Sequence, residues 1–179
     1  EAWLVSDSTV PMVVMRAFWR GGSAIEPVGA VGVTGVMTDM LTEGSGAMNA
    51  NAFKERLQDL NMSVSFGASW DGVGMSLTTL SENRDAAFEM ARVALHEPRF
   101  DAEPLARIKR QMLVGLRTRE TNPSYLANLA LDQALYASHP YARRTSRESV
   151  DAITRATLQE RHAALFNRAT LQITIVGDI

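Results

Sequence analysis

The residues of this chain that could do chemistry are few: three histidines, no cysteine, and two carboxylates one helical turn apart. His96, His139 and His162 lie far apart in the sequence, and none has a second histidine within the spacing that metal ligands use. His162 follows Glu160 by two residues, and residues two apart point to different sides of a helix. We therefore expect structural or surface histidines and no metal site among them.

The two carboxylates are Asp39 and Glu43, whose spacing places them on one side of a helix. Such a pair could exchange a proton as a general acid and a general base. Two carboxylates at this spacing also repel each other, which is tolerable at the solvated end of a helix. The sequence favours the solvated helix end, with the acid–base pair as the alternative.

Motifs for serine hydrolases and for phosphate binding are absent. Gly44-Ser45-Gly46 is shorter than the G-x-S-x-G elbow and follows a helix, whereas the elbow needs a preceding strand. Gly29, Gly32 and Gly35 recur every third residue but match neither the P-loop nor the dinucleotide fingerprint. The sequence thus indicates neither chemistry.

The charge balance argues against nucleic acid or an anionic membrane as the main partner. The formal net charge is -2, and no long run of one sign occurs, whereas both partners need clustered Lys and Arg. A small basic cluster consists of Arg143, Arg144 and Arg147. It could bind phosphate, but we favour a solvated loop.

Length and composition indicate a single globular domain. The chain has 179 residues, of which 46% are hydrophobic, enough for a substantial core. No apolar run approaches the roughly 18 residues that span a bilayer. The absence of cysteine excludes disulfides but leaves the compartment open, and the periplasm is favoured over the cytoplasm. The chain starts at Glu1 and ends in a strand-like segment, so residues 1–179 are expected to be part of a longer two-domain protein.

The order of the expected elements predicts an α+β fold, a mostly antiparallel sheet with helices packed on one face. Residues 2–6 and 12–19 are predicted to be paired strands, and residues 61–68 form a hairpin with the strand after Asp71-Gly72. A final strand is expected at 171–176. The helices are expected at about 32–43, 51–60, 81–95, 104–119, 125–136, 146–153 and 157–166.

The first of these helices contains an unexplained glycine. Its apolar stripe is clear, and Gly44 stands where a left-handed C-cap belongs. Gly35, however, lies inside the helix, where glycine costs about 1 kcal/mol relative to alanine. The stripe consists of Val33, Val36, Met37, Met40 and Leu41.

Several segments, in this order, resemble the N-terminal domain of the M16 family of zinc metallopeptidases, which includes insulin-degrading enzyme, pitrilysin, the mitochondrial processing peptidase and the respiratory complex III core subunits. The segments are FWRGGSAIEP, GAVGVTGVMTDMLTEGSG, SENRDAAFEMARVALHEPRF, HPYARRTSRESVDAIT and LQITIVGDI, spread over nearly the whole chain. No single segment is decisive, but their order and spacing make the resemblance fairly specific. The fold that it implies is the M16-type half-domain.

The resemblance implies a zinc site whose ligands are missing here. Active members carry H-x-x-E-H on the first helix and a later glutamate on a long helix. The H-x-x-E-H positions fall on Gly35, Thr38 and Asp39, and the later glutamate falls on Gly115 or its neighbour Val114. One carboxylate cannot hold zinc, which needs about three protein donors. The sequence predicts no catalytic residue and no metal at this site.

Gly35 and Gly115 thus both stand where the resemblance places ligands. Small residues there would let two helices approach each other across the space that the metal would fill. Alternatively, Gly35 marks a tight helix crossing without any such history.

The resemblance also implies a substrate-binding strand, formed by Val64, Ser65, Phe66, Gly67 and Ala68. In active relatives an extended peptide adds to the edge of this strand through main-chain hydrogen bonds. Those backbone groups do not depend on the missing ligands. The alternative is an ordinary hairpin strand whose edge is covered.

By this resemblance, we expect a non-catalytic subunit that pairs with a zinc-bearing M16 paralogue and helps to enclose peptides. Self-association is the other pairing, and the Ala- and Arg-rich composition favours a bacterial source. The alternatives are a purely structural assembly protein, similar to the complex III core subunits, and an active hydrolase with an unrecognised site.

The sequence predicts that the purified protein holds no stoichiometric zinc, because the four ligand positions supply one carboxylate between them. Elemental analysis after dialysis against zinc measures this directly. One zinc per chain would contradict the prediction.

Overall fold

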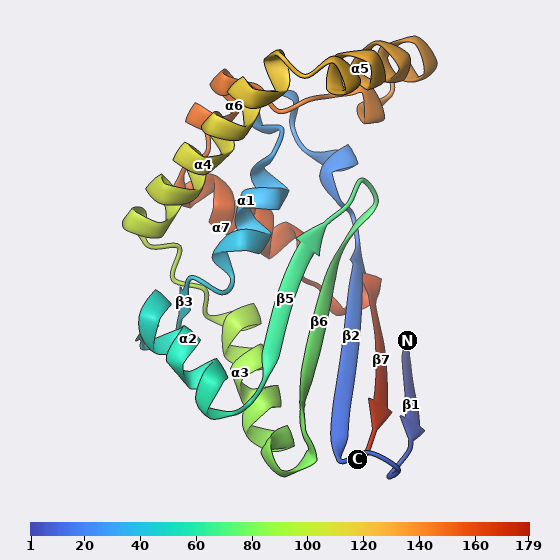
Figure 1. The fold of residues 1–179 in the computed structure, drawn as a ribbon, viewed down its shortest axis with the longest axis vertical. Coiled ribbons are helices and arrows are strands. Elements are labelled where there is room, and N and C mark those ends of the chain that lie inside the picture. The colour runs from blue at the N-terminus through green and yellow to red at the C-terminus, as the bar shows by residue number, and fades with distance from the viewer.

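The computed structural model describes residues 1–179 and has a five-stranded sheet as its centre. Neighbouring strands follow the order β1-β7-β2-β6-β5, and only β1 and β7 are parallel (Figure 1). The predicted class, a mostly antiparallel sheet in an α+β fold, is confirmed. The strands are β1 (Ala2–Ser6), β2 (Met12–Arg20), β5 (Ser63–Ala68), β6 (Gly72–Leu80) and β7 (Leu171–Gly177), with β3 (Gly44–Ser45) and β4 (Met48–Asn49) forming a separate small pair.

One predicted strand pairing is wrong. β1 does not pair with β2, because β7 lies between them and pairs with both. Ala2 lies opposite Ile173 in the parallel ladder, and Val14 lies opposite Val176 in the antiparallel one. A short turn between two apolar runs is typical of a hairpin, but the choice of partner depends on a strand about 160 residues later. The β5–β6 hairpin, a purely local pairing, is as predicted.

The helices lie on one face of the sheet and beyond one end of it (Figure 1). α5 projects at that end and has no buried residue. No helix is both long enough and apolar enough to cross a membrane. The helices are α1 (Val33–Met40), α2 (Ala50–Asp59), α3 (Arg84–His96), α4 (Ala102–Glu120), α5 (Pro123–Tyr136), α6 (Arg147–Asp151) and α7 (Arg155–Leu165).

The core forms two clusters. One packs the inner face of the sheet against α2 and α3, with Phe53 and Leu77 fully buried. The other surrounds α1, between α4, α7 and the sheet, and includes the whole predicted stripe of α1. The burial of that stripe confirms the helical period read from the sequence.

Gly44 has a different role from the predicted one. α1 ends at Met40 with Leu41 as its C-cap, and Gly44 begins β3. Its φ of 113° is in the left-handed region, and a Cβ there would lie 3.0 Å from the Met48 carbonyl oxygen. The tight β3–β4 turn, rather than the helix end, therefore requires this glycine.

A buried polar network holds the N-terminus of α1. The two carboxylate oxygens of Glu26 accept hydrogen bonds from the backbone N–H groups of Gly32 (2.8 Å) and Thr34 (2.7 Å). Arg161 of α7 donates to the Thr34 hydroxyl (2.9 Å) and to the carbonyl oxygens of Gly21 (2.6 Å) and Gly22 (2.8 Å). Burial lowers the pKa of Arg161, and the negative charge of Glu26 opposes that shift. The network joins three separate segments to α1.

Replacing Arg161→Met is expected to lower the free energy of unfolding by about 3 kcal/mol, because it leaves buried oxygen atoms without donors. Urea denaturation followed by circular dichroism measures the change. Arg155→Met is the matched control, since Arg155 lies on the same helix and is exposed. Equal stability of the two variants would contradict a structural role for the network.

Candidate functional site

The motif positions lie on two neighbouring helices, with Gly35, Thr38 and Asp39 on α1 and Gly115 on α4. Thr38 is buried, and its hydroxyl donates to the Gly35 carbonyl oxygen at 2.8 Å. Asp39 is exposed. The two glycines supply no side-chain donor, so the four positions offer one carboxylate and one internally bonded hydroxyl.

The predicted close approach of the two helices at the glycines is wrong. A Cβ built on Gly35 or on Gly115 would meet no other part of the molecule within 4 Å. Gly115 instead borders a cavity of about 280 Å³ with Asp39 and Arg119, and Gly35 borders another of about 400 Å³. The buried stripe of α1 and the Glu26–Arg161 network position this helix, so its place does not depend on contact with α4 at the two glycines.

Asp39 and Glu43 lie in different surroundings, since Asp39 is exposed and Glu43 is buried. Partial burial, and secondly the charge of Glu43, raise the pKa of Asp39. Glu43 is only 9% exposed, and its carboxylate lies between Lys54 (3.2 Å) and Arg107 (2.6 Å). The expectation of a solvated end therefore holds for Asp39 but is wrong for Glu43, whose charge is balanced by two cations.

Two of the three histidines, His139 and His162, make structural contacts, and His96 is exposed. The Nε2 atom of His162 lies 2.8 Å from the Leu95 carbonyl oxygen, and the ring packs against Phe100 and Phe166. Burial lowers the pKa of His162. His139 Nδ1 accepts a hydrogen bond from the Tyr141 N–H group at 3.2 Å. The structure contains no group of three His, Cys, Asp or Glu side chains close enough to hold a metal.

The predicted substrate strand is β5, and it is an edge strand. It pairs with β6 alone, so no strand of this chain covers its other side. Ser69 and Gly72 form a hydrogen-bonded pair, since the Ser69 N–H group donates to the Gly72 carbonyl oxygen at 2.8 Å. Along an antiparallel strand, residues whose backbone bonds to the partner strand alternate with residues whose backbone points away from it. Val64, Phe66 and Ala68 therefore direct their backbone N–H and C=O groups to the free edge. No strand of this chain pairs with that edge, and peptide binding there stays a prediction.

An open groove follows this edge, and we call it the β5 groove. It begins as a cavity of about 300 Å³ between Val64–Phe66, Asp39 and Arg107. That cavity shares Asp39 and Gln111 with the one at Gly115, which in turn shares Arg119 with the one at Gly35. The three cavities are therefore neighbours. Residues of α1 and α4 line all three, and β5 residues line the first and the last.

The basic cluster is only partly a solvated loop. Arg143 donates to the Glu26 carbonyl oxygen (2.9 Å). Arg144 donates to the carbonyl oxygens of Tyr141 and Arg143, pairs with Asp132 and stacks over Trp70. Only Arg147 is exposed, so the solvated-loop expectation is wrong for the two anchored arginines.

Sequence reasoning missed Glu26, Arg161 and Arg119. Glu26 lies six residues before Gly32, the first amide that it binds, and this is outside the usual capping distance. Arg161 and Arg119 carried no motif at all. Only their positions in the folded chain distinguish them from other arginines.

Comparisons with known proteins agree with the fold. No protein-family model matches the chain. Over 172 residues the chain is 28% identical to a Helicobacter pylori protein named non-peptidase homolog YmxG, and the match covers 95% of this chain and 40% of that protein. A peptidase M16 inactive domain from Pseudomonas fluorescens matches 99% of this chain and 44% of its own, with 33% identity and a TM-score of 0.93.

Two proteases share the fold at greater sequence distance. A protease from Helicobacter pylori has a TM-score of 0.85 at 15% identity, covering 98% of this chain and 44% of its own. The periplasmic protease PqqL from Escherichia coli has a TM-score of 0.84 at 15% identity, covering 98% of this chain and 21% of its own. This chain thus spans less than half the length of the relatives that it matches.

Replacing Gly35→Ala or Gly115→Ala is expected to raise the free energy of unfolding by about 0.5–1 kcal/mol, because each new methyl group enters open space in a helix. Chemical denaturation measures the change. In contrast, Gly22→Ala would force a methyl group into the Ser69 carbonyl oxygen and should lower stability. Destabilisation by the two helical substitutions would show that the helices are tightly packed at these sites.

Proposed function

We propose that this chain, a homologue of the inactive M16 peptidase domains, is the non-catalytic partner of a zinc-bearing M16 subunit and holds peptide against the edge of β5. One observation carries the proposal. The backbone of an edge strand remains accessible beside a groove, while the side chains needed for hydrolysis are missing from the same place. Such an arrangement can bind an extended peptide but has no means to cleave it.

The missing chemistry follows from the residue types. Zinc in catalytic sites has three protein ligands and a water molecule. Asp39 is the only carboxylate among the four motif positions, and Thr38 donates its hydroxyl hydrogen to its own helix. A threonine also lacks the basicity to deprotonate water near neutral pH. The names of two relatives, an inactive M16 domain and a non-peptidase homologue, support the same conclusion for this chain.

The binding capacity follows from the backbone of β5. Three residues direct main-chain groups outward, and small side chains at Ser65 and Gly67 leave the outer face of the strand unobstructed. A peptide added here would form a sixth strand. Main-chain hydrogen bonds would supply affinity that is tolerant of sequence, as a chamber for varied substrates requires.

Pairing with an active subunit would supply the missing zinc. The fold is shared with proteases as well as with inactive domains, which supports a pair built from one of each. The periplasmic description of PqqL supports the periplasm as the compartment in which this pair acts.

A purely structural assembly role is the second candidate, favoured by the exposed apolar side chains of β1 and α5. Trp3, Leu4 and Val5 are about half exposed, and Leu131 and Leu135 are similarly uncovered. Such surfaces are typical of protein–protein contacts. Peptide binding by the complex with a catalytically inactivated partner separates the two functions, because only the first requires it.

Adding the purified protein to a zinc-bearing M16 paralogue is expected to raise the rate at which an unfolded peptide is cleaved. The protein alone should cleave none. Ala68→Pro should abolish most of the gain, because proline removes an N–H group that β5 directs to the free edge. Cleavage is measured by the fluorescence of a quenched peptide.

Ala68→Val is the matched control, since valine keeps the N–H group and suits an exposed strand. It should retain the gain. Cleavage by the isolated protein, or a gain that Ala68→Pro leaves intact, would contradict the proposal.

A further inference from the structure

The cavity beside Gly35 is lined by several positively charged side chains, and we call it the Arg119 cavity. Its volume is about 400 Å³, and it lies at the Ala68 end of the β5 groove. Three arginines line it, Arg119, Arg143 and Arg144, together with one acidic residue, Glu26. The arginines outnumber the acidic residue, so the lining carries a net positive charge.

The acidic residue forms no ion pair with these arginines. Both carboxylate oxygens of Glu26 accept hydrogen bonds from backbone amides at the N-terminus of α1, and the side chain is buried. Arg144 forms an ion pair with Asp132 and donates hydrogen bonds to two backbone carbonyl oxygens. Arg143 makes one hydrogen bond, to the backbone of Glu26, and no ion pair.

Arg119 makes the fewest polar contacts of the three arginines. Its side chain forms no ion pair and no hydrogen bond, and its single contact of note places the guanidinium 5.7 Å from the centre of the Tyr125 ring. It lines the Arg119 cavity, the cavity at Gly115 and a larger one between α4 and α5. A guanidinium held against an aromatic ring is oriented without losing its N–H donors.

The surroundings give the cavity a firm wall. Trp70, in the β5–β6 turn, packs against Tyr141 at 5.2 Å between ring centres, and the guanidinium of Arg144 lies 5.5 Å from the centre of the Trp70 ring. The Tyr141 hydroxyl donates to Asp71 at 2.7 Å, which fixes the tip of the hairpin. The residues at this end of the β5 groove are therefore held in place by their contacts with one another.

We propose that the Arg119 cavity binds a carboxylate of the bound peptide, with Arg119 as the principal partner and Arg143 as the second. Arginine presents paired N–H donors that match the two oxygens of a carboxylate. The carboxylate comes from an acidic side chain or from the C-terminus of the peptide. This inference rests on the proposed function, because it places the peptide in the β5 groove.

The test uses the full-length protein and labelled, unstructured peptides that are amidated at the C-terminus and carry one glutamate at successive positions. A matched set carries glutamine instead. Fluorescence anisotropy gives the dissociation constants. At one position the glutamate peptide is expected to bind about tenfold more tightly than its glutamine counterpart, the size of a charge-assisted hydrogen bond at a partly solvated site. A glutamine peptide with a free C-terminal carboxylate distinguishes the second source.

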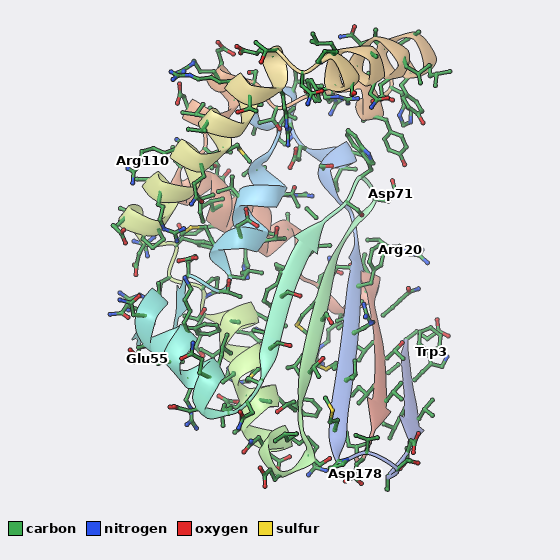
Figure 2. All side chains as sticks on the ribbon, viewed as in Figure 1. Trp3, Arg20, Glu55, Asp71, Arg110 and Asp178 are labelled. Carbon is green, nitrogen blue, oxygen red and sulfur yellow. The ribbon has the colours of Figure 1, made fainter.

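Arg119→Gln should remove this preference and leave the affinity for the glutamine peptides unchanged. Arg119→Lys should keep part of it, because the charge remains without the paired donors. Arg110→Gln is the matched control, since Arg110 lies on the same helix and is exposed like Arg119 but lines none of the three cavities and points away from the groove (Figure 2). It should bind like the unmodified protein.

The outcomes separate the two proposals. If glutamate, glutamine and free-acid peptides all bind equally well, the carboxylate site is wrong while peptide binding stands. The carboxylate site is also wrong if Arg119→Gln weakens the binding of glutamate and glutamine peptides alike, since that indicates a structural role for Arg119. If no peptide binds, the proposed function fails and the carboxylate site fails with it.

Discussion

The capture of the N-terminus of α1 by Glu26 is the interaction on which the arrangement of this domain depends. A helix begins with backbone N–H groups that have no partner inside the helix, and here one buried carboxylate accepts hydrogen bonds from two such groups. The negative charge also lies at the positive end of the helix dipole. Arg161 then joins the same corner to α7 and to the end of β2, through the carbonyl oxygens of Gly21 and Gly22. Hydrogen bonds from separate segments of the chain thereby fix the start of α1.

This arrangement explains how the space between α1 and α4 stays open. In a metal site, ligands from two helices are drawn to a common ion, and the ion contributes to folding. Here α1 is held at its start by hydrogen bonds and along its length by a buried apolar stripe. No contact at Gly35 or Gly115 is needed to keep the helices in place, so a groove persists where packing would otherwise have closed it.

Local patterns predicted much of the fold. The stripe of α1, the β5–β6 hairpin and the long helix α4 all follow from periodicity and turn residues within a short window. The predictions failed where the deciding partner is distant in sequence. β1 pairs with β7 instead of its neighbour, and Glu43 is neutralised by Lys54 and Arg107, which no spacing rule connects to it. The open space at Gly35 and Gly115 could not be predicted from the sequence either, because a glycine can equally allow close packing or leave a void.

The open positions at Gly35 and Gly115 have a consequence for how such a domain can change over time. A Cβ atom could be introduced at both positions without moving the main chain, because no atom outside the local helix lies within 4 Å of it. Substitution of either glycine by alanine is therefore compatible with the same architecture.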